Sequence, residues 1–304
     1  MKEAAMYEAA KHETGKLPVF YRPEMSASTA SFSPSSSKPA AAVADWLAHG
    51  LDIELLDFEP ATEAQVKRAH SAEYVDAIMQ GRKKNGFGNT SQDVADSLPY
   101  TSGSMVAAAL HVLKHGGLAC SPSSGFHHAR YAEAGGYCTF NGLMVAALEV
   151  LAQRPHARIA IVDFDMHYGD GTDDIIKRLG LSKRIYHVRA GFEFEAGMGR
   201  FFMWRLVDMI LSTREYFGRA PDLVLYQAGA DQHISDPLGG LLNTEQMLNR
   251  DAYVLQSYAR WRVPLVFNLA GGYQTDKAGT IASVLTLHRN TMIQAIKAKG
   301  LYEC

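Results

Sequence analysis

Short apolar runs recur along this chain, separated by longer segments with helical periodicity, and this alternation limits what it can fold into. Several runs are continuous rather than alternating with polar residues, which is typical of strands covered on both faces. Strands separated by helices favour a parallel sheet with helices on both sides. The predicted strands are Ile53–Phe58, Gly117–Ser121, Ile159–Phe164, Ile185–Val188, Leu223–Tyr226 and Leu265–Leu269. The predicted helices are Ser102–Lys114, Asn141–Gln153, Thr244–Arg260 and Asp276–Lys297.

The size and charge of the chain narrow the class of protein further. A length of 304 residues is near the upper limit for one hydrophobic core, so we expect a single domain over residues 1–304. The formal net charge of -2 gives no overall basic field to hold nucleic acid, and no apolar run approaches the roughly 18–20 residues of a membrane span. Three widely spaced cysteines are not a disulfide framework. We therefore expect a cytoplasmic protein without nucleic-acid or membrane partners, and the composition leaves a homo-oligomer open.

One low-complexity stretch, Ser26 to Ala42, is rich in Ser, Ala and Pro. We predict a surface loop that ends where a helix begins near Lys38. An ordinary connection and a mobile loop at the rim of a site both remain open for it.

Polar side chains follow four of the predicted strands, at the edge where parallel sheets bind ligands. Asp165 and His167 are two residues apart, so in an extended segment both point the same way. Asp231, at a neighbouring strand end, adds a second carboxylate. Three oxygen and nitrogen ligands with one open position are typical of a catalytic zinc site. A lone D-x-H is more often a helix cap or a surface ion pair, but four such strand ends in one chain favour the metal site.

The tandem histidines His127 and His128 lie in a Ser/Gly-rich loop after another strand. A lone buried histidine is usually a hydrogen-bonded core residue, whereas two beside a metal site suit proton transfer, because their ordinary pKa is near neutral. Each ring needs an acceptor to fix its tautomer, and Asp163 and Asp170 are the nearest candidates.

Tyr273 follows the glycine pair Gly271–Gly272 after the last predicted strand. A tyrosine is often part of the core. After a sharp glycine turn at a strand end, however, it suits a hydrogen-bond donor to a developing oxyanion.

These blocks of sequence together carry a resemblance to a known family. The chain resembles the histone deacetylase superfamily, which includes bacterial deacetylase-like proteins and the acetylpolyamine amidohydrolases. Residues 12–15 (HETG) are similar to the family's N-terminal H-x-T-G element. The likeness implies an α/β protein with the single-domain arginase–deacetylase fold, an eight-stranded parallel sheet with helices on both faces. The matching blocks are GFHHA (Gly125–Ala129), GGYCTFNG (Gly135–Gly142), VDFDMHYGDGT (Val162–Thr172), GADQHISDPLGG (Gly229–Gly240) and LAGGY (Leu269–Tyr273).

The resemblance implies a zinc-dependent deacetylase that hydrolyses an N-acyl amine such as acetyl-lysine, with one Zn²⁺ per chain. It assigns zinc binding to Asp165, His167 and Asp231. It assigns His128 as general base and acid, and His127 as its electrostatic partner.

Further matches complete the implied site. Asp163 and Asp170 match the carboxylates behind the two histidines, and Tyr273 matches the residue that polarises the substrate carbonyl. Gly136 and Tyr137 match the tunnel wall around the acyl-lysine stem.

The residue after Asp236-Pro237 is Leu238, an apolar residue at the expected mouth of the tunnel. Polyamine-selective relatives place an acid near the mouth, where it attracts the cationic chain. We therefore expect acyl-lysine or neutral acylamines to be preferred over acetylated polyamines.

The region after Val188 departs most from the family pattern. A second aromatic tunnel wall normally comes from this stretch, and Phe192 and Phe194 are both candidates. Family members also hold a K⁺ ion with ligands from the residues matching Asp163, Asp165 and His167 and from a small hydroxyl residue at the end of the next strand. No serine is available there, and Arg189 falls at or beside that position. Either Arg189 replaces the ion or it points to solvent at a strand end.

Two other functions are weighed against a deacylase. A binuclear manganese ureohydrolase needs acids two residues after the metal His and Asp, where this chain has Gly169 and His233. A catalytically weak binding protein would be expected to lack a ligand, His128 or Tyr273, and all are present.

Overall fold

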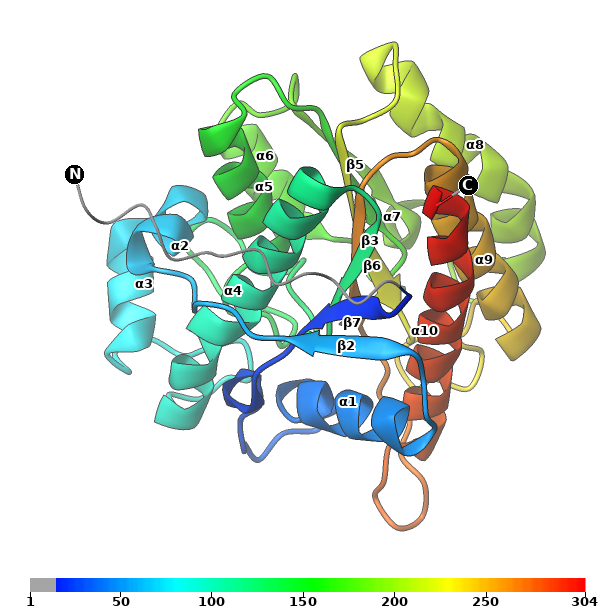
Figure 1. The fold of residues 1–304 in the computed structure, drawn as a ribbon. Helices are drawn as coiled ribbons and strands as arrows, with labels where there is room; N and C mark the ends of the chain where they lie inside the picture. The colour runs from blue at the N-terminus through cyan, green and yellow to red at the C-terminus, as the bar shows by residue number, and fades with distance from the viewer. Residues whose placement is uncertain (1–14, 304) are drawn as a thin grey trace.

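The computed structural model describes residues 15–303, so the first three residues of the HETG element, His12, Glu13 and Thr14, lie outside the described residues. Its centre is one parallel sheet with the strand order β2-β1-β3-β7-β6-β4-β5 (Figure 1). The strands are β1 Leu17–Phe20, β2 Ile53–Leu56, β3 Leu118–Ser121, β4 Ile159–Asp163, β5 Ile185–Arg189, β6 Leu223–Gly229 and β7 Leu265–Ala270.

All six predicted strands are present and parallel, which confirms the predicted fold class. The sheet has seven strands within the described residues, not the eight that the resemblance implied. The strand that the sequence did not indicate is β1, a four-residue segment in which Pro18 cannot donate to a ladder.

Helices cover both faces of the sheet and divide the core into two layers. One face carries α1 Lys38–Ala48, α8 Gly199–Phe217, α9 Thr244–Arg260 and α10 Ala282–Glu303. The other carries α4 Gln92–His115, α5 Gly142–Gln153 and α6 Asp170–Arg178. The short helices α2 Glu63–Ala69, α3 Ala72–Met79 and α7 Ala190–Glu193 and two 3₁₀ turns, η1 Pro23–Met25 and η2 Pro34–Ser36, complete the described elements.

The predicted helix starts differ from the structure at two places. Helix α4 begins ten positions before Ser102 and contains Pro99, because the upstream turn already buries Val94 and Leu98. Helix α10 begins later than predicted, because the Asp276 carboxylate accepts bonds from two following backbone N–H groups and closes a turn instead.

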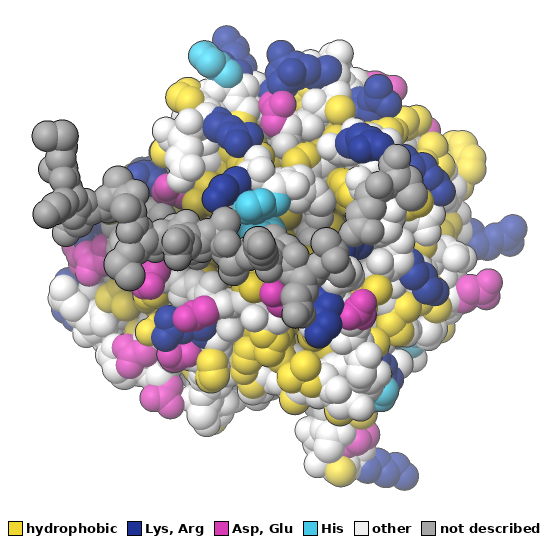
Figure 2. All heavy atoms as spheres, in the orientation of Figure 1, with side chains coloured by type: hydrophobic (Ala, Val, Ile, Leu, Met, Phe, Trp, Pro, Cys, Tyr) yellow, Lys and Arg dark blue, Asp and Glu magenta, His cyan; other side chains and the backbone are white. Residues whose placement is uncertain are grey.

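No helix of the described residues is long and apolar enough to cross a membrane. On the face shown in Figure 2, Lys and Arg side chains are spread among acidic and apolar ones rather than gathered in one continuous patch.

The strand order places β7, β6 and β4 side by side, so their carboxyl ends meet at one edge. The loops that follow these strands and the neighbouring β3 carry most of the predicted site residues.

Candidate active site

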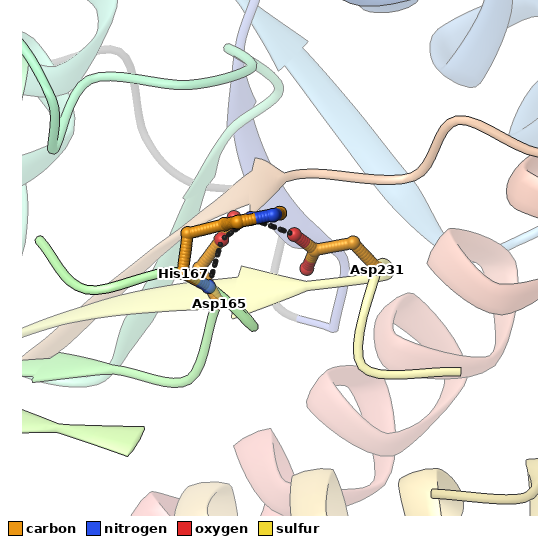
Figure 3. A group of neighbouring side chains, drawn as sticks. All are labelled: Asp165, His167 and Asp231. Carbon is orange, nitrogen blue, oxygen red and sulfur yellow. Dashed lines mark hydrogen bonds and ion pairs between the residues drawn. The ribbon is translucent and has the colours of Figure 1, made fainter. Parts of the chain in front are cut away.

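Three predicted metal ligands converge where β4 and β6 end. Asp165 and His167 follow β4, Asp231 follows the neighbouring β6, and the three side chains point toward one another (Figure 3). The His167 Nδ1 atom lies 3.1 Å from Asp165 Oδ1 and 2.9 Å from Asp231 Oδ2. One ligand atom from each residue lies within 4.8 Å of the others.

The electrostatics of this cluster suit a bound cation. Asp165 and Asp231 are both buried, and burial together with the Asp165 charge raises the pKa of Asp231 to about 7. Two adjacent buried carboxylates are costly unless a proton or a positive charge lies between them. Two carboxylates and one imidazole, with no thiolate, are the donor types of a three-ligand catalytic zinc site, so these residues fit that metal.

A glycine makes this close approach possible. Gly271, just after β7, has a φ of +51°, and a Cβ there would lie 2.3 Å from the Asp231 carboxyl carbon. Only glycine leaves room for the last turn to fold over Asp231.

The inner histidine of the predicted pair is fully enclosed. His127 Nδ1 lies 2.8 Å from Asp163 Oδ2, and its Nε2 lies 3.6 Å from Asp165 Oδ1. Burial disfavours the charged ring, but the Asp163 and Asp165 carboxylates outweigh it and raise the pKa of His127 to about 9. The two carboxylates therefore favour the cationic form of His127.

The outer histidine lies nearer to solvent. His128 Nδ1 is 2.7 Å from Asp170 Oδ1, and Arg130 binds the other oxygen of Asp170 at 2.6 Å. Burial and the neighbouring His127 charge lower the pKa of His128. The two imidazole rings are 4.0 Å apart between centroids.

Tyr273 lies next to the predicted metal ligand His167. Its ring centroid is 6.5 Å from that of His167, and its backbone N–H donates to Asp236 Oδ2 at 2.7 Å. Burial and the Asp165 and Asp231 charges raise the pKa of Tyr273, so its hydroxyl stays protonated and can donate. Asp236 also accepts from the Leu238 N–H and so fixes both residues.

The predicted wall residues Gly136 and Tyr137 lie against the site residues His128 and Tyr273. Gly136 has a φ of +51°, and a Cβ there would lie 2.3 Å from a carbon of the His128 ring. Tyr137, at a φ of +63°, has its ring 5.7 Å from Tyr273. Leu238 is 40% exposed after Asp236.

A further aromatic residue, which the sequence did not single out, comes from the loop between Ser26 and Lys38. Phe32 stacks on Tyr273 with a centroid distance of 6.2 Å and an interplanar angle of 12°. The low-complexity segment thus lies at the site. Of the two predicted candidates for a second wall, Phe194 is buried against Phe202 in the core, and Phe192 packs on Tyr168.

Lys38 was also missed, because a lysine before a proline at a helix start is ordinary in sequence. Its side chain is fully buried, and the amine donates to Ser124 Oγ at 2.9 Å and to the Gly271 carbonyl. Burial lowers its pKa to about 8, against the raising effect of Asp231 and Asp165. Lys38 therefore ties α1 to the turn that carries Tyr273.

Comparison with known protein families gives one consistent result. The family described as "Histone deacetylase domain" matches residues 33–190 and 180–289. An uncharacterized protein of a Picosynechococcus strain is 27% identical over 275 residues, covering 80% of this chain and 89% of that protein. Acetylpolyamine amidohydrolase of Burkholderia pseudomallei is 28% identical over 183 residues, covering 52% of this chain and 51% of that protein. Histone deacetylase 2 of Arabidopsis thaliana is 29% identical over 214 residues, covering 63% of this chain and 53% of that protein.

A solved structure from the same group of proteins has a similar fold. A crystal structure of acetylpolyamine aminohydrolase from Burkholderia pseudomallei superimposes with a TM-score of 0.73 at 18% identity. The superposition covers 95% of this chain and 99% of that one, so the two proteins share their fold.

Proposed function

This chain belongs to the histone deacetylase family, and we propose that it is a zinc-dependent deacylase that converts an N-acyl amine, such as N-acetyl-lysine, to a free amine and a carboxylate. One observation carries the proposal: the Asp165–His167–Asp231 cluster lies beside two His–Asp pairs and a buried tyrosine. A metal site, proton-transfer groups and an oxyanion donor are together what amide hydrolysis requires.

Asp165, His167 and Asp231 would hold the metal. When bound, zinc would supply Lewis acidity toward the scissile carbonyl and toward a water molecule. One ion per chain follows from the three-ligand set, because Gly169 and His233 stand where a second ion would need acids.

The two histidines would have different roles, proton transfer for His128 and charge stabilisation for His127. The Asp170 bond to His128 Nδ1 leaves Nε2 as the nitrogen for proton transfer, and a lowered pKa keeps that nitrogen unprotonated at neutral pH. His128 would take the proton of the attacking water and later deliver it to the leaving amine. His127, held cationic by Asp163, would stabilise negative charge that develops beside it.

Tyr273 would donate its hydroxyl hydrogen to the oxyanion that forms from the carbonyl oxygen. Asp236 fixes the backbone of Tyr273, and the Phe32 stack limits where its ring can lie. Gly136 and Tyr137 would line the path of the acyl-lysine stem.

The apolar side chains near the site favour a substrate whose chain next to the acyl group is uncharged. Phe32, Tyr137 and Leu238 present aromatic and aliphatic surface there, and two of them are well exposed. We therefore infer a preference for acyl-lysine or neutral acylamines over acetylated polyamines, the substrates named for one relative.

The test uses purified protein with an acetyl-lysine peptide and with acetylspermidine, each before and after metal chelation and zinc return. We expect turnover that chelation abolishes and zinc restores, with a higher kcat/KM for the peptide. Asp231→Ala should lose both activity and zinc content while its circular dichroism is unchanged. A higher kcat/KM for acetylspermidine would overturn the substrate class. Turnover that survives in metal-free Asp231→Ala would overturn the mechanism.

A further inference from the structure

A third histidine, in the middle of β5, lies behind the metal cluster. His187 is buried, with its side chain 2% exposed. Its Nδ1 lies 2.9 Å from Asp173 Oδ1, and its Nε2 lies 3.4 Å from Asp163 Oδ2. Nδ1 makes a hydrogen bond with Asp173, and Nε2 faces Asp163 as an ion-pair contact, so a doubly protonated ring suits both carboxylates. Burial alone would disfavour that form, but Asp163 and Asp173 outweigh it and raise the pKa of His187.

The Asp163 carboxylate accepts three hydrogen bonds from protein donors. Its Oδ1 accepts from the Asp165 backbone N–H and from the Gln227 amide, both at 3.1 Å. Its Oδ2 accepts from His127 at 2.8 Å and faces His187. A carboxylate offers about four acceptor directions: protein donors use three of them, and His187 Nε2 lies 3.4 Å from Oδ2 without completing a hydrogen bond.

The space around Asp163 Oδ2 is equally restricted. A Cβ built on Gly169 would lie 2.5 Å from that oxygen and 2.9 Å from the His187 ring. The imidazole therefore takes the volume on this side of Asp163.

Asp173, the second carboxylate that contacts His187, also pairs with another cation, Arg189. Asp173 Oδ2 accepts from the Tyr168 hydroxyl at 2.7 Å and pairs with Arg189, whose guanidinium lies 5.0 Å from the centre of the Phe192 ring. Of the two alternatives open for Arg189, replacement of the ion or a solvent-facing side chain, the structure shows neither in full: the guanidinium is 35% exposed and pairs with Asp173. Arg189 neutralises Asp173, and His187 is the side chain between Asp173 and Asp163.

These contacts disagree with the K⁺ ion that the family resemblance implies behind the metal site. β5 reads Ile-Tyr-His-Val-Arg and offers no small hydroxyl ligand, and the Asp163 carboxylate already accepts three hydrogen bonds and has the His187 ring against its Oδ2 atom. We propose that the His187 imidazole is a built-in replacement for that monovalent cation. As a positioning residue, His187 holds Asp163 in place and, through Asp163, orients His127.

The first experiment measures potassium directly and needs no assumption about the substrate, so it is independent of the proposed function. Zinc-loaded wild-type protein is compared in potassium chloride and in tetramethylammonium chloride at equal ionic strength. We expect no bound potassium by elemental analysis after gel filtration, and a Tm difference below about 1 °C. A site with millimolar affinity would instead raise Tm by about 5 °C at 100 mM potassium. One potassium per chain, or such a rise in the wild type, would overturn the proposal.

The second experiment removes the His187 ring, so that potassium could bind beside Asp163. His187→Ser removes the ring and supplies a hydroxyl, and we expect its Tm to rise in potassium while the wild type does not respond. His156→Ser, at an exposed histidine paired with Arg184, is the matched control and should behave like the wild type. A folded His187→Ser protein that ignores potassium would contradict the replacement. If that variant does not fold, the wild-type potassium measurement still decides.

A third variant separates positioning from general stability. His187→Gln keeps one hydrogen bond but carries no charge, and we expect kcat to fall about tenfold with KM unchanged. Arg189→Gln removes a partner of Asp173 rather than of Asp163, so its kcat should fall less than that of His187→Gln. Equal losses in the two variants, or a change confined to KM, would remove the positioning role from His187.

Discussion

The two His–Asp pairs of the site have the same residue types but different surroundings. The inner pair, His127–Asp163, is enclosed, with side chains 3% and 1% exposed. The outer pair, His128–Asp170, is 22% and 27% exposed and shares its carboxylate with Arg130. The pKa of the inner histidine is raised, whereas that of the outer one is lowered.

The difference shows that neighbouring charges decide the role of each ring. His127 faces Asp163 and Asp165 at short range, so the carboxylates outweigh the penalty of burial. His128 has one carboxylate that Arg130 already compensates, and it has the His127 charge at its side. The inner ring is therefore suited to hold charge, and the outer ring to exchange a proton.

The largest expected effect separates these two roles. His128→Ala should lower kcat by about 10²–10⁴-fold with zinc content unchanged, because it removes the group that transfers the proton. His127→Ala should lower kcat less, because it removes electrostatic support rather than the proton carrier. Steady-state kinetics with matched zinc analyses measure both. If His127→Ala is the more damaging change, the assignment of the two rings is reversed.

The second prediction compares the carboxylates through stability. Asp163→Asn leaves the buried cations His127 and His187 without their shared anion, and we expect it to cost about 3–5 kcal/mol of unfolding free energy. Asp170→Asn affects a partly exposed pair and should cost about 1 kcal/mol or less. Urea unfolding at neutral pH gives both values. Similar costs for the two variants would show that burial does not distinguish the pairs.

Much of this comparison could be anticipated from sequence, because its signals are local. The D-x-H spacing after β4 and the tandem histidines place polar groups at strand ends, and continuous apolar runs identify the strands. The structure places the predicted residues together, although their chemical roles remain proposals.

The position behind the metal cluster was predicted less well, for a physical reason. Arg189 and His187 are two residues apart on one strand, so they share a face, and sequence cannot tell which is at the right depth. The register pairs Arg189 with Asp163 at the end of β4, and the deeper His187 lies opposite Ile161. Phe32 and Lys38 were missed because their partners, Tyr273 and Gly271, are more than 200 positions away.

His70 is a buried histidine that serves as a control for the comparison of His127 with His128. The change expected on its substitution is the smallest of those predicted. His70 is as enclosed as His127 but has no carboxylate partner: its Nδ1 donates to the Arg130 carbonyl and its Nε2 accepts from the Asn141 N–H, both at 2.9 Å. Burial lowers its pKa to about 4, against small raising effects of backbone carbonyls. Burial lowers the pKa of both rings, and only the carboxylates beside His127 reverse the net shift.

The sign of the stability effect follows from that shift. Between pH 6.5 and about 4, the unfolded chain binds a proton at His70 and the folded chain does not, so stability falls as pH decreases through this window. The loss is on the order of 2–3 kcal/mol at the lower end. His70→Gln keeps a donor and an acceptor but cannot titrate, so its unfolding free energy should fall less steeply than that of the wild type over the same range. Urea midpoints from pH 7 to 4 measure the two slopes, with exposed His156→Gln as the control. Parallel slopes for wild type and His70→Gln would show that burial alone does not keep this ring neutral.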